Sequence, residues 1–141
     1  MRRELELKFK ERWPDWFRHL YSDPRTSCLY IGFTHGDGWF DLVWQLCEQI
    51  EPIVLAEPGP EPFEVYQVKE KLGGLRFYNN HPSERIEELC TEAAERSLHV
   101  CEICGGPGSA GRCEQHRATR IVLGKFWDRI YGSRALPNLW H

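Results

Sequence analysis

A pattern of three cysteines and one histidine near the carboxyl end limits the fold of this chain more than any other feature. Residues 101–116 read CEICGGPGSAGRCEQH, with two residues between Cys101 and Cys104 and two between Cys113 and His116. Zinc in proteins prefers four tetrahedral ligands drawn from thiolates and imidazoles. The glycines between the two pairs allow the chain to turn one pair back onto the other. The spacing therefore predicts a metal centre made of these four side chains.

Four ligands from the protein fill a tetrahedral zinc site, so no position remains for an activated water molecule. We therefore expect a structural zinc ion. Three alternatives stay open: the loop is reduced and free of metal, Cys101 and Cys104 are a redox dithiol, or His99 replaces His116 as a ligand. No thioredoxin-like strand–helix–strand pattern precedes the two cysteines, which makes the redox alternative the weaker reading.

The remaining sequence favours a cytoplasmic protein with reduced thiols. No apolar run approaches the roughly 20 residues that a membrane-spanning helix needs. The first residues, MRRELELKFKERW, lack the apolar centre of a signal peptide. Disulfides are rare in the cytosol, so clustered cysteines favour metal binding there. Cys28, Cys47 and Cys90 stand in apolar segments and are expected to be buried thiols.

Apolar residues recur at helical spacing in four segments. Ser83 is the expected N-cap of the third helix, and Asp37 or Gly38 is the expected N-cap of the second. The pair Glu51-Pro52 predicts the end of the second helix, because proline has no backbone N–H to donate. The expected helices cover residues 2–13, 39–52, 84–98 and 117–131.

Two segments have the composition of β-strands. Residues 63–80 alternate in polarity around Gly73-Gly74, which predicts a β-hairpin with these glycines at its turn. Residues 28–33 are rich in β-branched and aromatic side chains and predict a short strand. Together with the helices they predict an α+β fold, with helices packed on a small antiparallel sheet and a treble-clef-like zinc knuckle at the carboxyl end.

The same elements predict how the chain is divided. We expect an α+β body over residues 1–99 and a zinc-binding module with its following helix over residues 100–131. Residues 132–141 are expected to form an extended tail. At 141 residues, the chain fits one domain with a small appendage.

Charge is distributed unevenly along the chain. Residues 1–100 carry 12 basic and 18 acidic groups, whereas residues 101–141 carry 6 basic and 3 acidic groups. Basic residues interleaved with aromatic ones are typical of nucleic-acid binding, although Arg112 and Arg117 also stand where they can neutralise an anionic Cys3His site. The candidate nucleic-acid contacts are Arg112, Arg117, Arg120, Lys125 and Arg129.

One further group has the residue types of acid–base chemistry. In THGDGWFD, His35 and Asp37 stand on a glycine-rich loop, where a histidine beside a carboxylate can act as a base. The simpler interpretation is structural, with the glycines making a turn and Asp37 capping the next helix. We favour the structural interpretation and do not expect the chain to be an enzyme.

Three motifs, GDGWFDLVWQLCEQIEP, VYQVKEKLGGLRFYNN and CEICGGPG followed by C-x2-H, occur in this order. The set resembles a family of small, uncharacterised bacterial and phage proteins with a GDGW helix, a KxKxGGLRFY hairpin and a zinc knuckle. The resemblance spans residues 28–116, and the segment between the two ligand pairs is shorter here. It implies no established activity, and its phage members imply a role in host interaction or counter-defence.

Three functions follow as hypotheses. The first is a non-enzymatic, zinc-stabilised protein that binds and inhibits another protein. The acidic body favours a basic partner, such as a nucleic-acid-binding enzyme. The second is an accessory protein that binds nucleic acid through the basic zinc module, and the third is an enzyme that uses His35 and Asp37.

Overall fold

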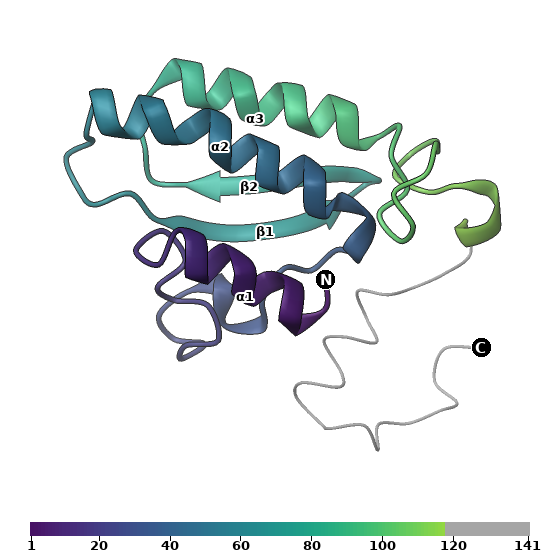
Figure 1. The fold of residues 1–141 in the computed structure, drawn as a ribbon, viewed down its shortest axis with the longest axis horizontal. Helices are drawn as coiled ribbons and strands as arrows, with labels where there is room; N and C mark the ends of the chain where they lie inside the picture. Colours follow the sequence, from purple (N-terminus) through teal and green to yellow (C-terminus); the bar gives the residue numbers. More distant parts are fainter. Residues whose placement is uncertain (118–141) are drawn as a thin grey trace.

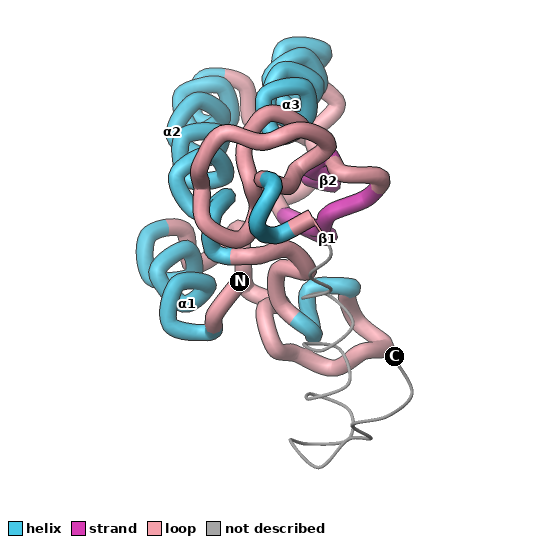
Figure 2. Tube along the Cα trace, turned by 90° about the vertical axis from the view of Figure 1, so that its right-hand side faces the viewer, coloured by secondary structure: helices cyan, strands magenta, loops and turns pink. Residues whose placement is uncertain are grey.

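The structure is a computed structural model that describes residues 1–117. Within these residues, three α-helices pack on a two-stranded antiparallel hairpin, which confirms the expected α+β class. Helix α2 lies between α1 and α3, and β2 lies between β1 and α3 (Figures 1 and 2). With η for a 3₁₀-helix, the elements are α1 (Arg3–Arg12), η1 (Cys28–Ile31), η2 (Asp37–Trp39), α2 (Phe40–Ala56), β1 (Val65–Lys71), β2 (Gly74–Asn79), α3 (Glu84–Ser97) and η3 (Glu114–His116).

Several expectations concern residues 118–141, which lie outside the described part of the chain. They are the helix expected up to residue 131, the extended tail over 132–141, and the contacts assigned to Arg120, Lys125 and Arg129. The treble-clef comparison also needs that helix. These expectations, and the domain boundaries drawn from them, stay predictions.

Helices α1 and α3 match the predicted segments within two residues. The Ser83 side chain accepts the backbone N–H of Ile86 at 3.5 Å, which confirms the predicted N-cap of α3. None of the helices in residues 1–117 is long and apolar enough to cross a membrane.

Helix α2 differs from the prediction at both ends. It continues through Pro52 to Ala56, so the predicted stop at Glu51-Pro52 is wrong. Pro52 is exposed, and the following Ile53 packs against the core, which favours one more helical turn despite the missing N–H. The expected cap is also wrong: Trp39 is the N-cap residue, without a side-chain hydrogen bond, and Asp37 binds Arg2 instead.

Aromatic side chains join α1 to α2 in the core. The ring of Phe9 is fully buried and lies 4.9 Å from Phe33, 5.2 Å from Phe40 and 5.1 Å from Trp44, measured between ring centroids. All three pairs meet edge to face, the arrangement that the charge distribution of aromatic rings favours. The contacts of Phe9 with Phe40 and Trp44 hold α1 against α2.

The hairpin turns one residue earlier than predicted. Leu72 and Gly73 have positive φ angles of 54° and 82°, which is the backbone of a tight type I′ turn. Gly74 is therefore the first residue of β2, paired with Lys71. Leu72 is 85% exposed, so its side chain reaches solvent at the tip of the hairpin.

The strand predicted over residues 28–33 is wrong, because this segment forms the 3₁₀-helix η1. The Ser27 side chain accepts the N–H of Leu29 at 3.1 Å and so starts a helical turn. Gly32 then ends it with a φ of 79°. The next N–H, that of Phe33, donates to the carboxylate of Glu6 at 3.0 Å and is not available to a sheet.

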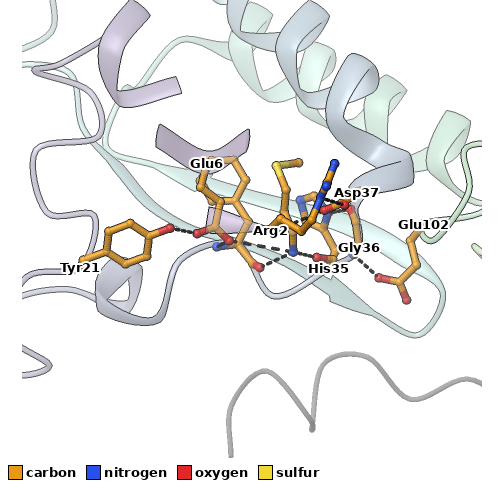
Figure 3. Close-up of polar contacts among 9 residues, drawn as sticks. Arg2, Glu6, Tyr21, His35, Gly36, Asp37 and Glu102 are labelled. Carbon is orange, nitrogen blue, oxygen red and sulfur yellow. Dashed lines mark hydrogen bonds and ion pairs between the residues drawn. The ribbon is translucent and has the colours of Figure 1, made fainter. Parts of the chain in front are cut away.

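A buried ionic network fastens the start of the chain to the segment after η1 (Figure 3). The Met1 ammonium donates to the carbonyl oxygens of Phe33, at 3.2 Å, and His35, and lies 3.9 Å from the Glu6 carboxylate. Glu6 is fully buried and also accepts the Tyr21 hydroxyl. A buried charge of this kind is tolerated because hydrogen bonds and an opposite charge compensate it. Removing one partner leaves a buried charge uncompensated in an interior of low dielectric constant.

We therefore expect Glu6→Ala to lower the free energy of unfolding by about 3–5 kcal/mol, since it removes the negative charge that balances the buried ammonium and the acceptor of the Phe33 N–H. Urea or guanidinium denaturation measures this change. Glu4→Ala is the matched control, because Glu4 is exposed on the same helix and surface changes usually stay within about 0.5 kcal/mol. Equal losses in the two variants would contradict the network.

Candidate metal centre

The chain after α3 folds into a compact loop that brings the two ligand pairs together. The N–H of Cys101 donates to the carbonyl of Gly106 at 2.8 Å, and the N–H of Gly105 donates to the carbonyl of Cys101 at 2.8 Å. Gly105 has a φ of 76°, a conformation that glycine adopts without strain. The turn aims Cys101 and Cys104 at one point, and η3 presents the other pair from the opposite side of the loop.

The four predicted ligands lie within reach of a single ion. Their ligand atoms are all within 4.8 Å of one another. The Sγ atoms of Cys104 and Cys113 are 3.9 Å apart, and Nδ1 of His116 lies 3.6 Å from Sγ of Cys101 and 3.2 Å from Sγ of Cys113. A tetrahedron with zinc–sulfur bonds of about 2.3 Å has sulfur–sulfur edges of about 3.8 Å. The cluster can therefore bind a metal ion such as zinc.

The thiols of this cluster titrate differently. Burial raises the pKa of Cys101, but N–H groups of Cys104, Cys113 and Ile103 and the His116 ring outweigh burial and lower this pKa to about 6. The N–H of Gly106 acts to lower the pKa of Cys104, yet burial and the two neighbouring sulfurs raise it overall. Gathered thiolates repel one another, and a divalent cation offsets that repulsion.

The structure bears on the alternatives for this loop. His99 is exposed and does not belong to the cluster, which contains His116. Cys113 and His116 lie next to Cys101 and Cys104 and make a set of four metal ligands. A redox dithiol would need only Cys101 and Cys104. The donor set and its spacing favour metal binding over a dithiol.

A buried carboxylate joins this loop to the body of the protein. Glu102 is fully buried, and its Oε2 accepts the N–H of Gly36 at 2.9 Å. Its Oε1 accepts Nε of Arg112 at 2.9 Å, and the same guanidinium makes a second contact through Nη2. Arg112 therefore neutralises Glu102, a role that the sequence analysis did not assign to it. Arg117 is exposed beside the cluster.

Backbone contacts reinforce this joint. The N–H of Gly38 donates to the carbonyl of Glu102 at 2.7 Å, and Nε1 of Trp39 donates to the carbonyl of Val100 at 2.7 Å. A Cβ on Gly36 would lie 2.3 Å from the Glu102 carbonyl oxygen, and one on Gly38 would lie 2.2 Å from that of Cys101. The glycines of THGDGW are thus required for close approach to the loop of residues 101–116, called the metal loop below, and not only for a turn.

The hairpin turn meets the same loop from another side. A Cβ on Gly73 would lie 2.4 Å from the carbonyl oxygen of Ala110, and one on Gly111 would lie 2.4 Å from that of Gly73. The sequence analysis missed this contact, because Gly73 was read as a turn residue and the isolated Gly111 as part of a flexible connection. All three motifs that carry the family resemblance meet at the metal loop.

His35 lies in the interior of the protein, and Asp37 lies at the edge of the interior. His35 is fully buried, its Nδ1 lies 2.8 Å from the carbonyl oxygen of Gly36, and its ring packs between Phe33 and Trp39. Asp37 accepts the backbone N–H and Nε of Arg2 at 2.7 and 2.6 Å (Figure 3). These contacts give both side chains structural partners.

The three cysteines outside the cluster differ in exposure. Cys47 is buried as expected, and burial raises its pKa well above the usual value. Cys90 is half-buried, and burial together with Glu87 raises its pKa to about 11. Cys28 is exposed, so its predicted burial is wrong; it starts η1 with its side chain toward solvent, while Leu29 fills the core.

We expect the purified chain to carry about one zinc ion, measured by elemental analysis, because the four donors form one complete set. Cys113→Ser removes a thiolate and should lower the metal content and the melting temperature together. Cys28→Ser is the matched control, since Cys28 lies outside the cluster and is exposed. A metal-free wild-type chain that is fully folded would contradict the site.

We also expect Gly38→Ala to destabilise the protein by about 2 kcal/mol or more, because its Cβ would overlap backbone atoms of the metal loop that cannot move aside. Gly59→Ala serves as the control, since its Cβ would approach no atom closer than 3.4 Å. Thermal and chemical denaturation compare the two variants. A neutral Gly38→Ala would mean that the loop and the body are not closely docked.

Comparison of the chain with protein-family models, with curated proteins and with solved structures finds no match. The resemblance to a family of bacterial and phage proteins therefore rests on the three motifs alone. Their convergence on one loop gives these motifs a shared structural role.

Proposed function

We propose that the chain is a non-enzymatic, zinc-stabilised protein that acts by binding another protein. The observation that carries the proposal is the complete Cys3His cluster, docked on the body through the buried Glu102. A zinc ion there is structural, because four protein ligands leave no position for a reacting water molecule. The ion holds residues 101–116 in one conformation.

The surroundings of the other polar groups support a function without catalysis. His35 is fully buried and packed between aromatic rings, which keeps it from a substrate. The carboxylate of Asp37 is occupied by Arg2. A general base needs to reach a proton of the substrate at hydrogen-bond distance. Burial keeps His35 from such a contact, and the ion pair with Arg2 engages Asp37.

The proposed partner is a protein with a basic surface, such as a nucleic-acid-binding enzyme, and the expected effect is inhibition. The excess of acidic groups in residues 1–100 supports this choice, since complementary charge speeds association and excludes partners of like charge. The resemblance to phage and bacterial proteins also supports an inhibitory role, since it suggests that the chain acts in counter-defence.

The test uses the full chain as bait in a bacterial lysate, with and without nuclease. We expect a protein to remain bound after nuclease treatment and to bind the purified chain at a fixed stoichiometry in calorimetry. Nucleic-acid binding would instead weaken by about 10³–10⁵ between roughly 50 and 200 mM salt. Recovery that disappears with nuclease would replace the proposal with the nucleic-acid alternative.

A further inference from the structure

A groove lies between β2 and α3, and α3 is on the side of β2 that faces away from β1 (Figures 1 and 2). Its volume is about 630 Å³. Consecutive residues 75–79 of β2 form one wall. Ile86, Cys90 and Ala94 recur at every fourth position of α3 and present one stripe to the groove. The groove is therefore elongated along the strand.

The two edges of the hairpin differ in their backbone hydrogen bonds. The outer edge of β1 is occupied: the N–H of Thr34 donates to Val68 at 3.0 Å, and the N–H of Glu70 donates to Thr34 at 3.2 Å. The pairing of Lys71 with Gly74 turns the backbone groups of Leu75 and Phe77 away from β1. Ser97 takes the N–H of Leu75 at 2.8 Å.

Phe77 is the open position of that edge. Its N–H and carbonyl point into the groove and make no hydrogen bond within residues 1–117. No strand of the described part pairs with β2 on this side. An unpaired strand edge is a template for another extended segment, which gains affinity through main-chain hydrogen bonds.

Acidic side chains of α3 lie next to the groove: Glu87 lines it together with Arg76, and the other glutamates belong to the adjoining acidic face. Glu87 lines both the groove and the neighbouring acidic face, as Thr91 does. Arg85 pairs with two of the glutamates, at 3.1 Å to Glu88 and 3.7 Å to Glu92. Within the described residues, Glu87 and Glu95 make no ion pair. The acidic face consists of Glu84, Glu87, Glu88, Glu92 and Glu95.

We infer that this groove receives an extended, basic segment of a protein partner, which adds a strand to β2. The inference rests on the proposed protein-binding function and names the surface that performs it. Backbone groups of the segment pair with Phe77, and its Lys or Arg side chains meet Glu87 in the groove and Glu95 on the adjoining acidic face. A helix or a nucleic acid fits less well, because a helix has no free backbone groups for the edge and phosphates are repelled by the glutamates.

The first experiment uses a synthetic peptide of alternating Arg and Val, about as long as β2, added to the full chain. NMR hydrogen exchange follows the Phe77 amide, and calorimetry gives the affinity. We expect the peptide to bind and to protect this amide. A peptide methylated on alternate backbone nitrogens should bind at least about tenfold more weakly, because it cannot pair with the edge.

The second experiment changes the charges of the chain. Glu87→Lys with Glu95→Lys should weaken binding of the Arg–Val peptide about tenfold or more. Glu4→Lys with Glu11→Lys is the matched control, since both residues are exposed on α1, away from the groove. A peptide of alternating Glu and Val should not bind the wild-type chain.

Three results would overturn the inference: no binding, equal binding of the methylated peptide, or a Phe77 amide that is already protected in the chain alone. The last result would mean that the chain itself or a second copy fills the edge. The partner test separates this inference from the proposed function. If the Glu87→Lys, Glu95→Lys chain still binds the partner of the wild type, the groove is not the binding surface and the proposed function stands. If the wild type binds no protein, the proposed function fails, and the peptide experiment still decides whether the groove binds an extended segment.

Discussion

The arrangement of this protein depends on one buried carboxylate. Glu102 lies between Cys101 and Cys104 in the sequence. In the fold it connects the body to the loop, because it accepts hydrogen bonds from the N–H of Gly36 and from the guanidinium of Arg112. A buried carboxylate is costly unless hydrogen bonds and an opposite charge satisfy it. Gly36 and Arg112 supply both, so the docked position of the loop is the one that satisfies this carboxylate.

The glycines show how a sequence motif acquires a structural meaning. GDGW, KLGG and the loop of residues 101–116 belong to separate segments, and each brings at least one glycine to a surface where backbones approach without room for a Cβ. Side chains at Gly38 or Gly73 would overlap the carbonyl oxygens of Cys101 or Ala110. These glycines therefore allow separate segments to pack closely. A metal ion bound in the loop would stabilise the contact between the loop and the body, as well as the conformation of the loop itself.

Local patterns in the sequence predicted the metal ligands, the hairpin and helices α1 and α3, because spacing and periodicity encode them directly. Tertiary contacts decided what the sequence did not reveal. Residues 28–33 have strand composition, yet Ser27 and Glu6 take the backbone N–H groups that a sheet would use. Arg112 was expected to neutralise the cluster or to contact nucleic acid, and it pairs with a carboxylate whose burial only the fold establishes.

The metal loop also bears on the groove between β2 and α3. The N–H of Gly111 donates to the carbonyl of Leu98 at 2.9 Å, just after α3, while the backbone beside it contacts the hairpin turn at Gly73. Ser97, one residue earlier, holds the start of β2. The loop thus fixes the distance between α3 and β2 at one end of the groove. Towards the other end the Asn79 amide lies 3.9 Å from the Cys90 sulfur, and Phe77 is between these two contacts. On the proposed function, an ion bound in this cluster would hold the shape of the groove without touching it, and this would give a non-enzymatic protein a use for a complete set of metal ligands.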